Sequence, residues 1–234
     1  MILKLKMIEQ TFWNKYVIFN IHAYNNSIQV LLMEKDFLGS VDLRYYRNKC
    51  PVLALDEYKK DQGQDEFSRK QVWFYVYGDE EIEEEFHRKL KSLVKARFID
   101  DEIDWSLMTL YPTHVKGEVN QHMQMLVKGL ASELGIKYDQ VIERTRTVNE
   151  NHELESGKAK ALNLEGSIEA RDVEGENVIL VDNISLSGVS LLHGAEEMLN
   201  SGAQNVFGLC LGMGEDFPYK RAVNRDKKAS ELIK

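Results

Sequence analysis

The sequence predicts an α/β fold, in which helices cover both faces of a parallel sheet, preceded by an N-terminal extension rich in β-structure. From about residue 103, short apolar segments alternate with amphipathic ones, as in folds that alternate strands and helices. Residues 178–181 are four consecutive apolar residues, a pattern typical of a strand buried on both faces. The first hundred residues lack this alternation and contain strand-like segments in succession.

The N-terminal extension is expected to contain several strands and one long helix. Residues 16–21 and 28–32 read as two strands joined by a short polar turn. Residues 56–71 are polar and are expected to form a loop or a frayed helix. The aromatic and β-branched run at 72–77 predicts a strand, because such residues favour strands. Residues 80–97 predict a helix with one apolar face.

A boundary near residue 100 is expected to separate this extension, or hood, residues 1–100, from a core domain, residues 101–234. The expected strands of the core are 105–111, 141–145, 167–170, 178–181 and 206–211. The expected helices are 118–134 and 189–201, with a polar loop at 146–157. The order of these elements indicates a parallel sheet with helices on both faces.

Composition and charge exclude several classes of function. The chain has 234 residues, of which 43% are hydrophobic and 29% charged, as in globular proteins. No apolar run of about 18 residues occurs, so we expect no transmembrane helix. The formal net charge of −8 argues against broad nucleic-acid binding. Only two cysteines occur, both in apolar settings, and the N-terminus does not resemble a secretory signal, so a cytoplasmic location is expected.

The segment from Val178 to Ser190 carries the clearest chemical signal. Its apolar strand ends at Asp182 and Asn183, and a Gly/Ser loop then leads into an amphipathic helix. Backbone N–H groups at the start of a helix are unpaired and favour an anion such as a phosphate. An acid at the end of the strand is well placed to accept hydrogen bonds from sugar hydroxyls. The alternative is an ordinary turn between a strand and a helix, with a helix cap.

This segment resembles the phosphoribosyl-diphosphate (PRPP) binding signature of type I phosphoribosyltransferases, which have a Rossmann-like α/β core. The resemblance implies that Asp182 and Asn183 act at the ribose during catalysis. It implies a 5-phosphate cradle made of the six residues Ser185, Leu186, Ser187, Gly188, Val189 and Ser190. Asn183 stands where the family has a second acid, and Leu186 stands where it usually has Thr.

The core is most similar to the ComF-like (amidophosphoribosyltransferase-like) branch of this family, over roughly residues 103–212. The resemblance implies a loop that holds the diphosphate, made of Thr113, His114, Lys116 and Gly117. A lid over the ligand would be supplied by Arg144, Arg146, Lys158 and Lys160. The two lysines also fit a solvated helix face, and the two arginines also fit an exposed strand.

Two functions of different classes follow from the resemblance. The first is an enzyme that transfers phosphoribose from PRPP to a nucleobase. The chemistry implies Mg²⁺, because PRPP carries several negative charges, and Asp182 would be an indirect ligand of a metal held mainly by the substrate. The second is a non-catalytic binding module for PRPP or a nucleotide, for example in nucleotide sensing, DNA uptake or a phage-defence assembly. A homodimer or a protein assembly partner is expected, and no membrane.

Overall fold

The computed structural model describes residues 16–24, 27–34, 38–42, 49–59, 65–98, 103–150, 154 and 157–214. Its main sheet has six strands, which follow one another in space in an order different from the chain. They are β3 (Leu38–Asp42), β4 (Lys49–Tyr58), β10 (Asn205–Gly214), β9 (Asn177–Ser185), β5 (Leu107–Leu110) and β6 (Lys137–Tyr138). All neighbouring pairs are parallel except β3 with β4.

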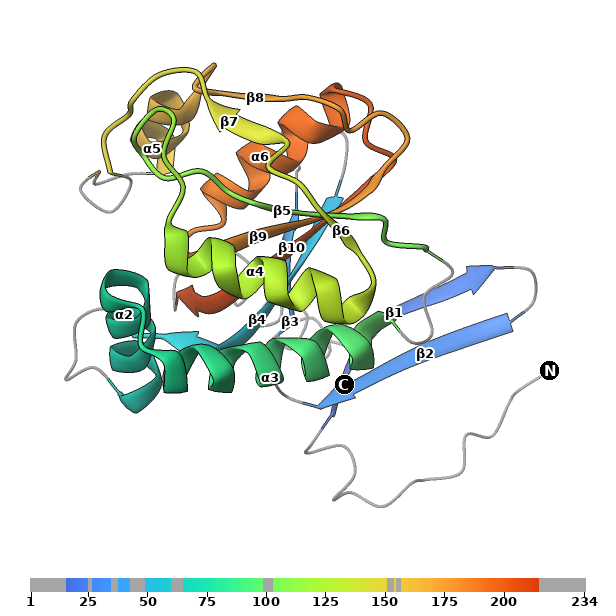
Figure 1. The fold of residues 1–234 in the computed structure, drawn as a ribbon. Helices are drawn as coiled ribbons and strands as arrows, with labels where there is room; N and C mark the ends of the chain where they lie inside the picture. The colour runs from blue at the N-terminus through green and yellow to red at the C-terminus, as the bar shows by residue number, and fades with distance from the viewer. Residues whose placement is uncertain are drawn as a thin grey trace.

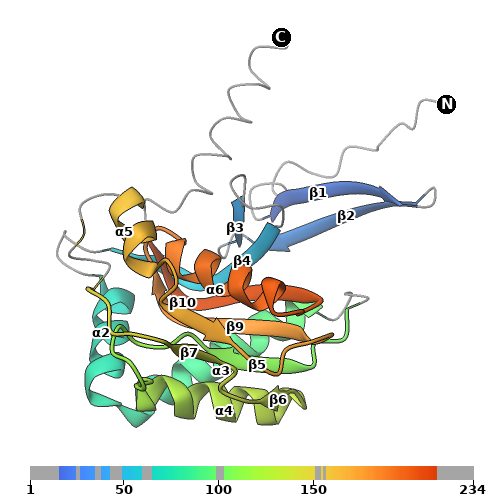
Figure 2. The same cartoon turned by 90° about the horizontal axis from the view of Figure 1, so that it is seen from above.

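Helices cover both faces of this sheet, which confirms the expected α/β fold (Figure 1). On one face lies α6 (Val189–Asn200), with α5 (Gly157–Leu164) next to it. On the other lie α2 (Glu66–Tyr77), α3 (Glu80–Phe98) and α4 (Gln121–Leu134), as the view from above also shows (Figure 2). Each face buries its own apolar cluster. No helix in the described part of the chain has the length and apolar content that a membrane span requires.

Two smaller strand pairs accompany the main sheet. The predicted N-terminal strands are present as β1 (Tyr16–Tyr24) and β2 (Ser27–Glu34), which pair antiparallel. The turn expected at residues 25 and 26 lies outside the described residues. The short strands expected near 143 and 168 are also present, as β7 (Ile142–Arg144) and β8 (Ile168–Ala170). They pair antiparallel with each other instead of joining the main sheet.

The strand predicted at 72–77 is wrong, because these residues form the second half of α2. Asp65 caps the helix by accepting a hydrogen bond from the Ser68 backbone N–H, and Gly78 ends it in the left-handed conformation. The buried residues Ser68, Gln71 and Phe74 recur every three positions, which is a helical spacing. Packing of this face against the sheet therefore outweighs the β-propensity of the aromatic residues.

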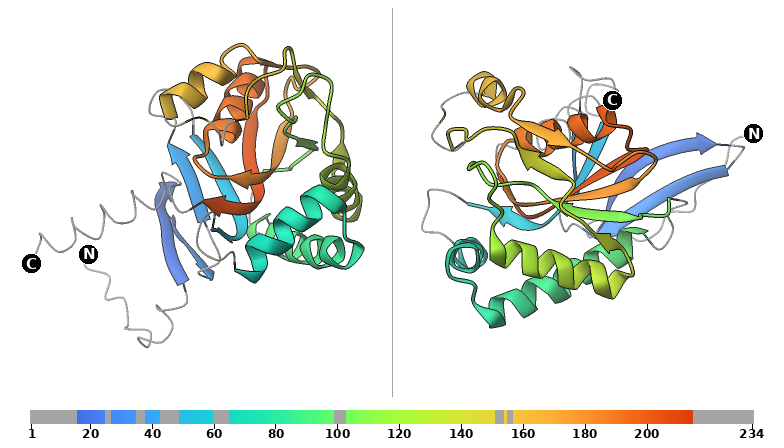
Figure 3. Two further views of the ribbon diagram at one scale, coloured as in Figure 1. Left: turned by 90° about the vertical axis from the view of Figure 1, so that its left-hand side faces the viewer. Right: turned by 45° about the horizontal axis from the view of Figure 1, so that its top comes forward.

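The main sheet extends across the boundary expected near residue 100. β4 lies in the N-terminal part of the chain, yet it pairs in parallel with β10 from Val52 to Tyr58. Helices α2 and α3 follow β4 and cover the same face of the sheet as α4 (Figure 3). The sequence analysis did not identify β4 as a strand. One sheet therefore contains strands from both sides of residue 100.

Gly212 of β10 allows α2 to approach the sheet closely. A Cβ atom added there would lie 2.4 Å from Gln71 Oε1 and 3.0 Å from Tyr58 Cβ, so one of these groups would have to move. We expect Gly212→Ala to lower the free energy of unfolding by about 1–3 kcal/mol, the usual cost of overpacking. Urea denaturation measures the effect. The control is Gly129→Ala in α4, whose Cβ would meet nothing closer than 3.4 Å; equal stability of the two variants would contradict the prediction.

Candidate phosphate-binding pocket

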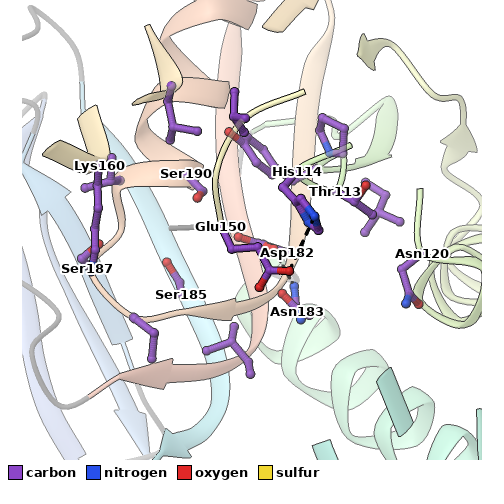
Figure 4. Close-up of a pocket in the computed structure, with 18 of the residues that line it drawn as sticks. Thr113, His114, Asn120, Glu150, Lys160, Asp182, Asn183, Ser185, Ser187 and Ser190 are labelled. Atoms are coloured by element: carbon purple, nitrogen blue, oxygen red, sulfur yellow. Dashed lines mark hydrogen bonds and ion pairs between the residues drawn. The ribbon is translucent and has the colours of Figure 1, made fainter. Parts of the chain in front are cut away.

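A pocket of about 470 Å³ opens at the carboxyl ends of the parallel strands. It forms there because β5 ends at Leu110, opposite Val181, while β9 continues beside β10 to Ser185. Ligands in open α/β sheets bind at such a strand edge. In Figure 4, Lys160 and Ser187 lie on one side of the pocket, Asn120 lies on the other, and Asp182 lies between them.

Every residue of the predicted signature, from Asp182 to Ser190, lines this pocket. The residues from Ser185 to Ser190 form the predicted phosphate cradle. The lining residues of this segment are Asp182, Asn183, Ile184, Ser185, Leu186, Ser187, Gly188, Val189 and Ser190. Gly188 adopts a left-handed conformation, with φ of 76°, and begins α6. No side chain of the described residues caps this helix, so its first N–H groups stay available to a ligand.

Asp182 lines the pocket, and its pKa lies well above the ordinary value of an aspartate. It lies on β9, between β5 and β10 in the sheet. We expected it at the end of the strand, but β9 continues beyond it to Ser185. Burial raises the pKa of Asp182 to about 7, although the Asn183 backbone N–H and the charge of Arg144 both act to lower it. The N–H of Asn183 donates to Asp182 Oδ1 at 2.8 Å. The carboxyl group can therefore exchange a proton near neutral pH.

The expected diphosphate loop contributes two of its four residues to the pocket. Thr113 and His114 line it, whereas Lys116 and Gly117 lie outside its lining. The imidazole Nε2 of His114 lies 3.5 Å from a carboxylate oxygen of Glu150, a contact that Figure 4 marks with a dashed line. The segment after Arg146 supports this turn, because the backbone N–H of Lys116 donates to Thr147 Oγ1 at 3.1 Å.

The four residues expected to form a lid occupy different places. Lys160 lines the pocket from α5, and Arg144 lines it from β7. Arg144 is buried beneath the turn at Thr113, which is not the position of a mobile lid. Arg146 donates to the carbonyl oxygens of Asn163 and Glu165 and lies outside the pocket lining. The side chain of Lys158 lies outside the described residues.

The sequence analysis missed the wall that the N-terminal part gives to the pocket. Tyr58 at the end of β4 and Tyr75 of α2 both line it. One turn before Tyr75, the buried side chain of Gln71 donates from Nε2 to the carbonyl oxygen of Asn183 at 2.6 Å. Helix α2 is thereby tied to the signature strand. The polar Gln71 on an apolar helix face would have been a signal, but only if residues 66–77 had been predicted as a helix.

The comparisons with known proteins show low similarity. No protein family model matches the chain, and no curated protein matches it. Among solved structures, the chain is similar to glutamine PRPP amidotransferase from B. subtilis, with 17% identity, 59% of this chain and 30% of that chain covered, and a TM-score of 0.38. The chain is 14% identical to Leishmania donovani UMP synthase, with 66% of this chain and 27% of that chain covered, and a TM-score of 0.38. It is 10% identical to adenine phosphoribosyl transferase from Trypanosoma brucei, with 68% of this chain and 83% of that chain covered, and a TM-score of 0.40.

The chain spans less than a third of the length of the amidotransferase and of the UMP synthase. Identities and TM-scores at this level leave the function to be inferred from the pocket itself.

Proposed function

We propose that the chain binds PRPP or a nucleotide 5-phosphate in this pocket. One observation carries the proposal: the whole signature, from Asp182 to Ser190, lines the pocket, and it includes the N-terminus of α6, which no side chain of the described residues caps. The backbone N–H groups after Ser187 and the hydroxyls of the loop would hold the 5-phosphate. The carboxylate of Asp182 and the side chain of Asn183 would accept and donate hydrogen bonds at the ribose hydroxyls.

The diphosphate of PRPP would lie at the turn formed by Thr113 and His114. Both residues line the same pocket as the phosphate loop, and Lys160 supplies a positive charge. Cations and N–H donors at this place would stabilise the charge that develops on a leaving diphosphate. Lys116 and Gly117 would act only by shaping the turn, since neither lines the pocket.

The donor set fits a magnesium ion held mainly by the substrate. Among the described residues, no three His, Cys, Asp or Glu side chains gather to form a metal site. Asp182 and Asn183 nevertheless offer oxygen atoms, the ligands that Mg²⁺ prefers. When bound, the ion would offset the negative charge of the diphosphate. The residues of the chain would hold and orient the sugar.

The reaction proposed for this site is transfer of phosphoribose to a nucleobase. A ring nitrogen of the base would form a bond to the anomeric carbon while the bond to the diphosphate breaks, with inversion. The protein supplies positioning and charge stabilisation for such a step. Cys50 and Cys210 are buried and form no disulfide, which favours a reducing compartment such as the cytoplasm for this reaction.

A second candidate is a non-catalytic module that binds PRPP or a nucleotide within a homodimer or a larger assembly. Two residues of the pocket favour it. Asn183 brings no negative charge to the ribose, and Leu186 brings no hydroxyl to the phosphate cradle. Compared with the family pattern, Asn183 and Leu186 make the site less polar, whereas an active transferase would need polar groups at these two positions. The module would then use the same pocket for sensing instead of turnover.

Isothermal titration of the full chain with PRPP and with AMP, each with and without Mg²⁺, tests the proposal. We expect binding of at least one ligand, and Ser187→Ala should weaken it by about 2- to 10-fold through loss of one hydrogen bond. Ser201→Ala, at the far end of α6, is the matched control and should bind as wild type does. Diphosphate release that depends on an added nucleobase identifies an enzyme, and binding without release identifies a module. Absence of binding by wild type would refute both candidates.

A further inference from the structure

Helix α2 leaves a stripe of large apolar side chains in solvent. The α2 stripe consists of Trp73, Val76 and Tyr77, which are 52%, 54% and 64% exposed. They make up three of the five large hydrophobic residues that are exposed in the described part of the chain. Their spacing of three and four positions places them on one side of the helix. The ring centres of Trp73 and Tyr77 lie 4.4 Å apart, so the two rings form one aromatic surface.

The opposite side of α2 packs within the molecule. Ser68, Gln71 and Phe74 are fully buried there, and Tyr75 lines the pocket. Helix α2 lies at the edge of the molecule, so the stripe faces away from the sheet (Figures 1 and 2). Tryptophan and tyrosine are enriched at protein interfaces, and burial of their apolar area would be stabilising. The stripe therefore indicates a surface that contacts another protein chain.

Opposite charges stand at the two ends of the α2 stripe. Arg69 lies one turn before Trp73. Glu80 and Glu81 begin α3, just after Tyr77. All three charged residues are exposed. The ion pairs between described residues of α2 and α3 use Lys70, Glu66, Glu85 and Lys89. They leave Arg69, Glu80 and Glu81 without an ion pair among the described residues, so these charges are available to another chain.

This pattern of charges fits a second copy of the same chain. A two-fold interface brings identical patches together, so the patch must be complementary to itself. When two α2 helices pack antiparallel, the end of one helix that carries Arg69 meets the end of the other helix that is followed by Glu80 and Glu81. The two apolar stripes then cover each other in the middle. A partner of different sequence would not require opposite charges at the two ends of one patch.

We propose that α2 is the interface of a homodimer in which the two α2 helices pack antiparallel about a two-fold axis. The aromatic pair of one copy covers that of the other, and Arg69 of each copy pairs with Glu80 and Glu81 of the other copy. This inference does not depend on which ligand the pocket binds. Because Tyr75 on the same helix lines the pocket, the contact also braces the pocket wall.

Sedimentation velocity of the full chain over a range of concentrations tests the interface. We expect wild type to dimerise, and Trp73→Ser to raise the dissociation constant of the dimer at least about 10-fold, because buried aromatic residues carry much of the energy of an interface. The matched control is Leu162→Ser in α5, over the opposite face of the sheet, where Leu162 is 58% exposed. It should dimerise as wild type does. Both variants should keep the melting temperature of the monomer, since both side chains are exposed.

Two results would overturn the inference: a wild type that stays monomeric at every concentration, or a dimer that Trp73→Ser leaves intact. The first would leave the α2 stripe to a different protein, and the second would place the interface elsewhere on the chain. Neither result would alter the proposed function of the pocket.

Charge reversal tests the antiparallel arrangement. Arg69→Glu should weaken the dimer at least about 10-fold, because the new carboxylate faces Glu80 and Glu81 of the other copy. The double variant Glu80→Lys with Glu81→Lys should weaken it similarly, because its lysines face Arg69. The variant with all three changes restores opposite charges, so its dissociation constant should return to within about 3-fold of that of wild type. Failure of this variant to recover the dimer would overturn the antiparallel arrangement.

A disulfide trap gives a measurement that does not depend on the affinity of a weakened dimer. Val76 lies within the α2 stripe, and a two-fold axis through the stripe brings its two copies close together. The native Cys50 and Cys210 are both buried, so an added surface cysteine is the reactive one. Under mild oxidation we expect Val76→Cys to form a covalent dimer and Leu162→Cys to remain a monomer. Equal cross-linking of the two variants would overturn the inference.

Discussion

Replacement of Asp182 by Asn is expected to stabilise the ligand-free protein at neutral and alkaline pH, and to weaken its binding of PRPP. Burial raises the pKa of Asp182 from 3.8 to about 7 in the folded state. Between these two values the folded chain holds a proton that the unfolded chain has lost. The stability of wild type therefore falls as pH rises through this window, by about 1.4 kcal/mol per pH unit.

Asp182→Asn lacks this titration. The difference in the free energy of unfolding between wild type and variant therefore reports the titration of Asp182 alone. Between pH 5 and pH 8, we expect the stability of wild type to fall relative to Asp182→Asn by roughly 3 kcal/mol. Urea denaturation at four pH values measures this difference, with the exposed Asp104→Asn as the control. PRPP affinity should fall in Asp182→Asn, because an ionised acceptor at the ribose is lost. A pH-independent stability difference would contradict the raised pKa of the Asp182 carboxyl.

The double variant Asn183→Asp with Leu186→Thr is expected to bind PRPP at least about 10-fold more tightly in the presence of Mg²⁺. Both residues line the pocket. The new carboxylate adds a charge-assisted hydrogen bond near the ribose and the metal, worth roughly 1.5–3 kcal/mol. The new hydroxyl adds about 0.5–1.5 kcal/mol at the phosphate. A gain of 1.4 kcal/mol corresponds to a factor of ten in affinity.

Titration of PRPP into the double variant and into each single variant measures this gain. Omission of Mg²⁺ is the control, since most of the effect of Asn183→Asp should need the metal. If the double variant binds PRPP no better than wild type, or loses affinity for AMP, the two residues are adaptations to a different ligand. The binding-module candidate would then be favoured over the transferase.

The parts of the fold that the sequence predicted are those with a strong local pattern. The helices at 80–97 and 118–134 have a clear apolar face, and the structure places them at Glu80–Phe98 and Gln121–Leu134. The run of apolar residues before Asp182 identified β9, and the Gly/Ser loop after it identified the start of α6. The residues from Asp182 to Ser190 in this segment also line the pocket.

The missed parts depend on contacts between distant segments. β4 is a strand because it pairs with β10, more than 150 residues later in the chain, and a short-range pattern cannot contain that partner. Residues 72–77 are helical because Phe74 and Gln71 are buried against the sheet, which local propensity does not predict. Arg144 was expected at a lid because its charge is visible in the sequence, whereas its burial under Thr113 is not.

The most direct test of the account is the response of the backbone amides to ribose 5-phosphate, which carries only the sugar and the 5-phosphate. The central claim is that the loop from Ser185 to Ser190 and the start of α6 hold this phosphate. In ¹⁵N-labelled protein, we expect the amide resonances of Ser187, Gly188 and Val189 to shift on titration, while that of Gly129 in α4 stays unchanged. Shifts confined to another part of the molecule, or none at saturating ligand, would contradict the claim.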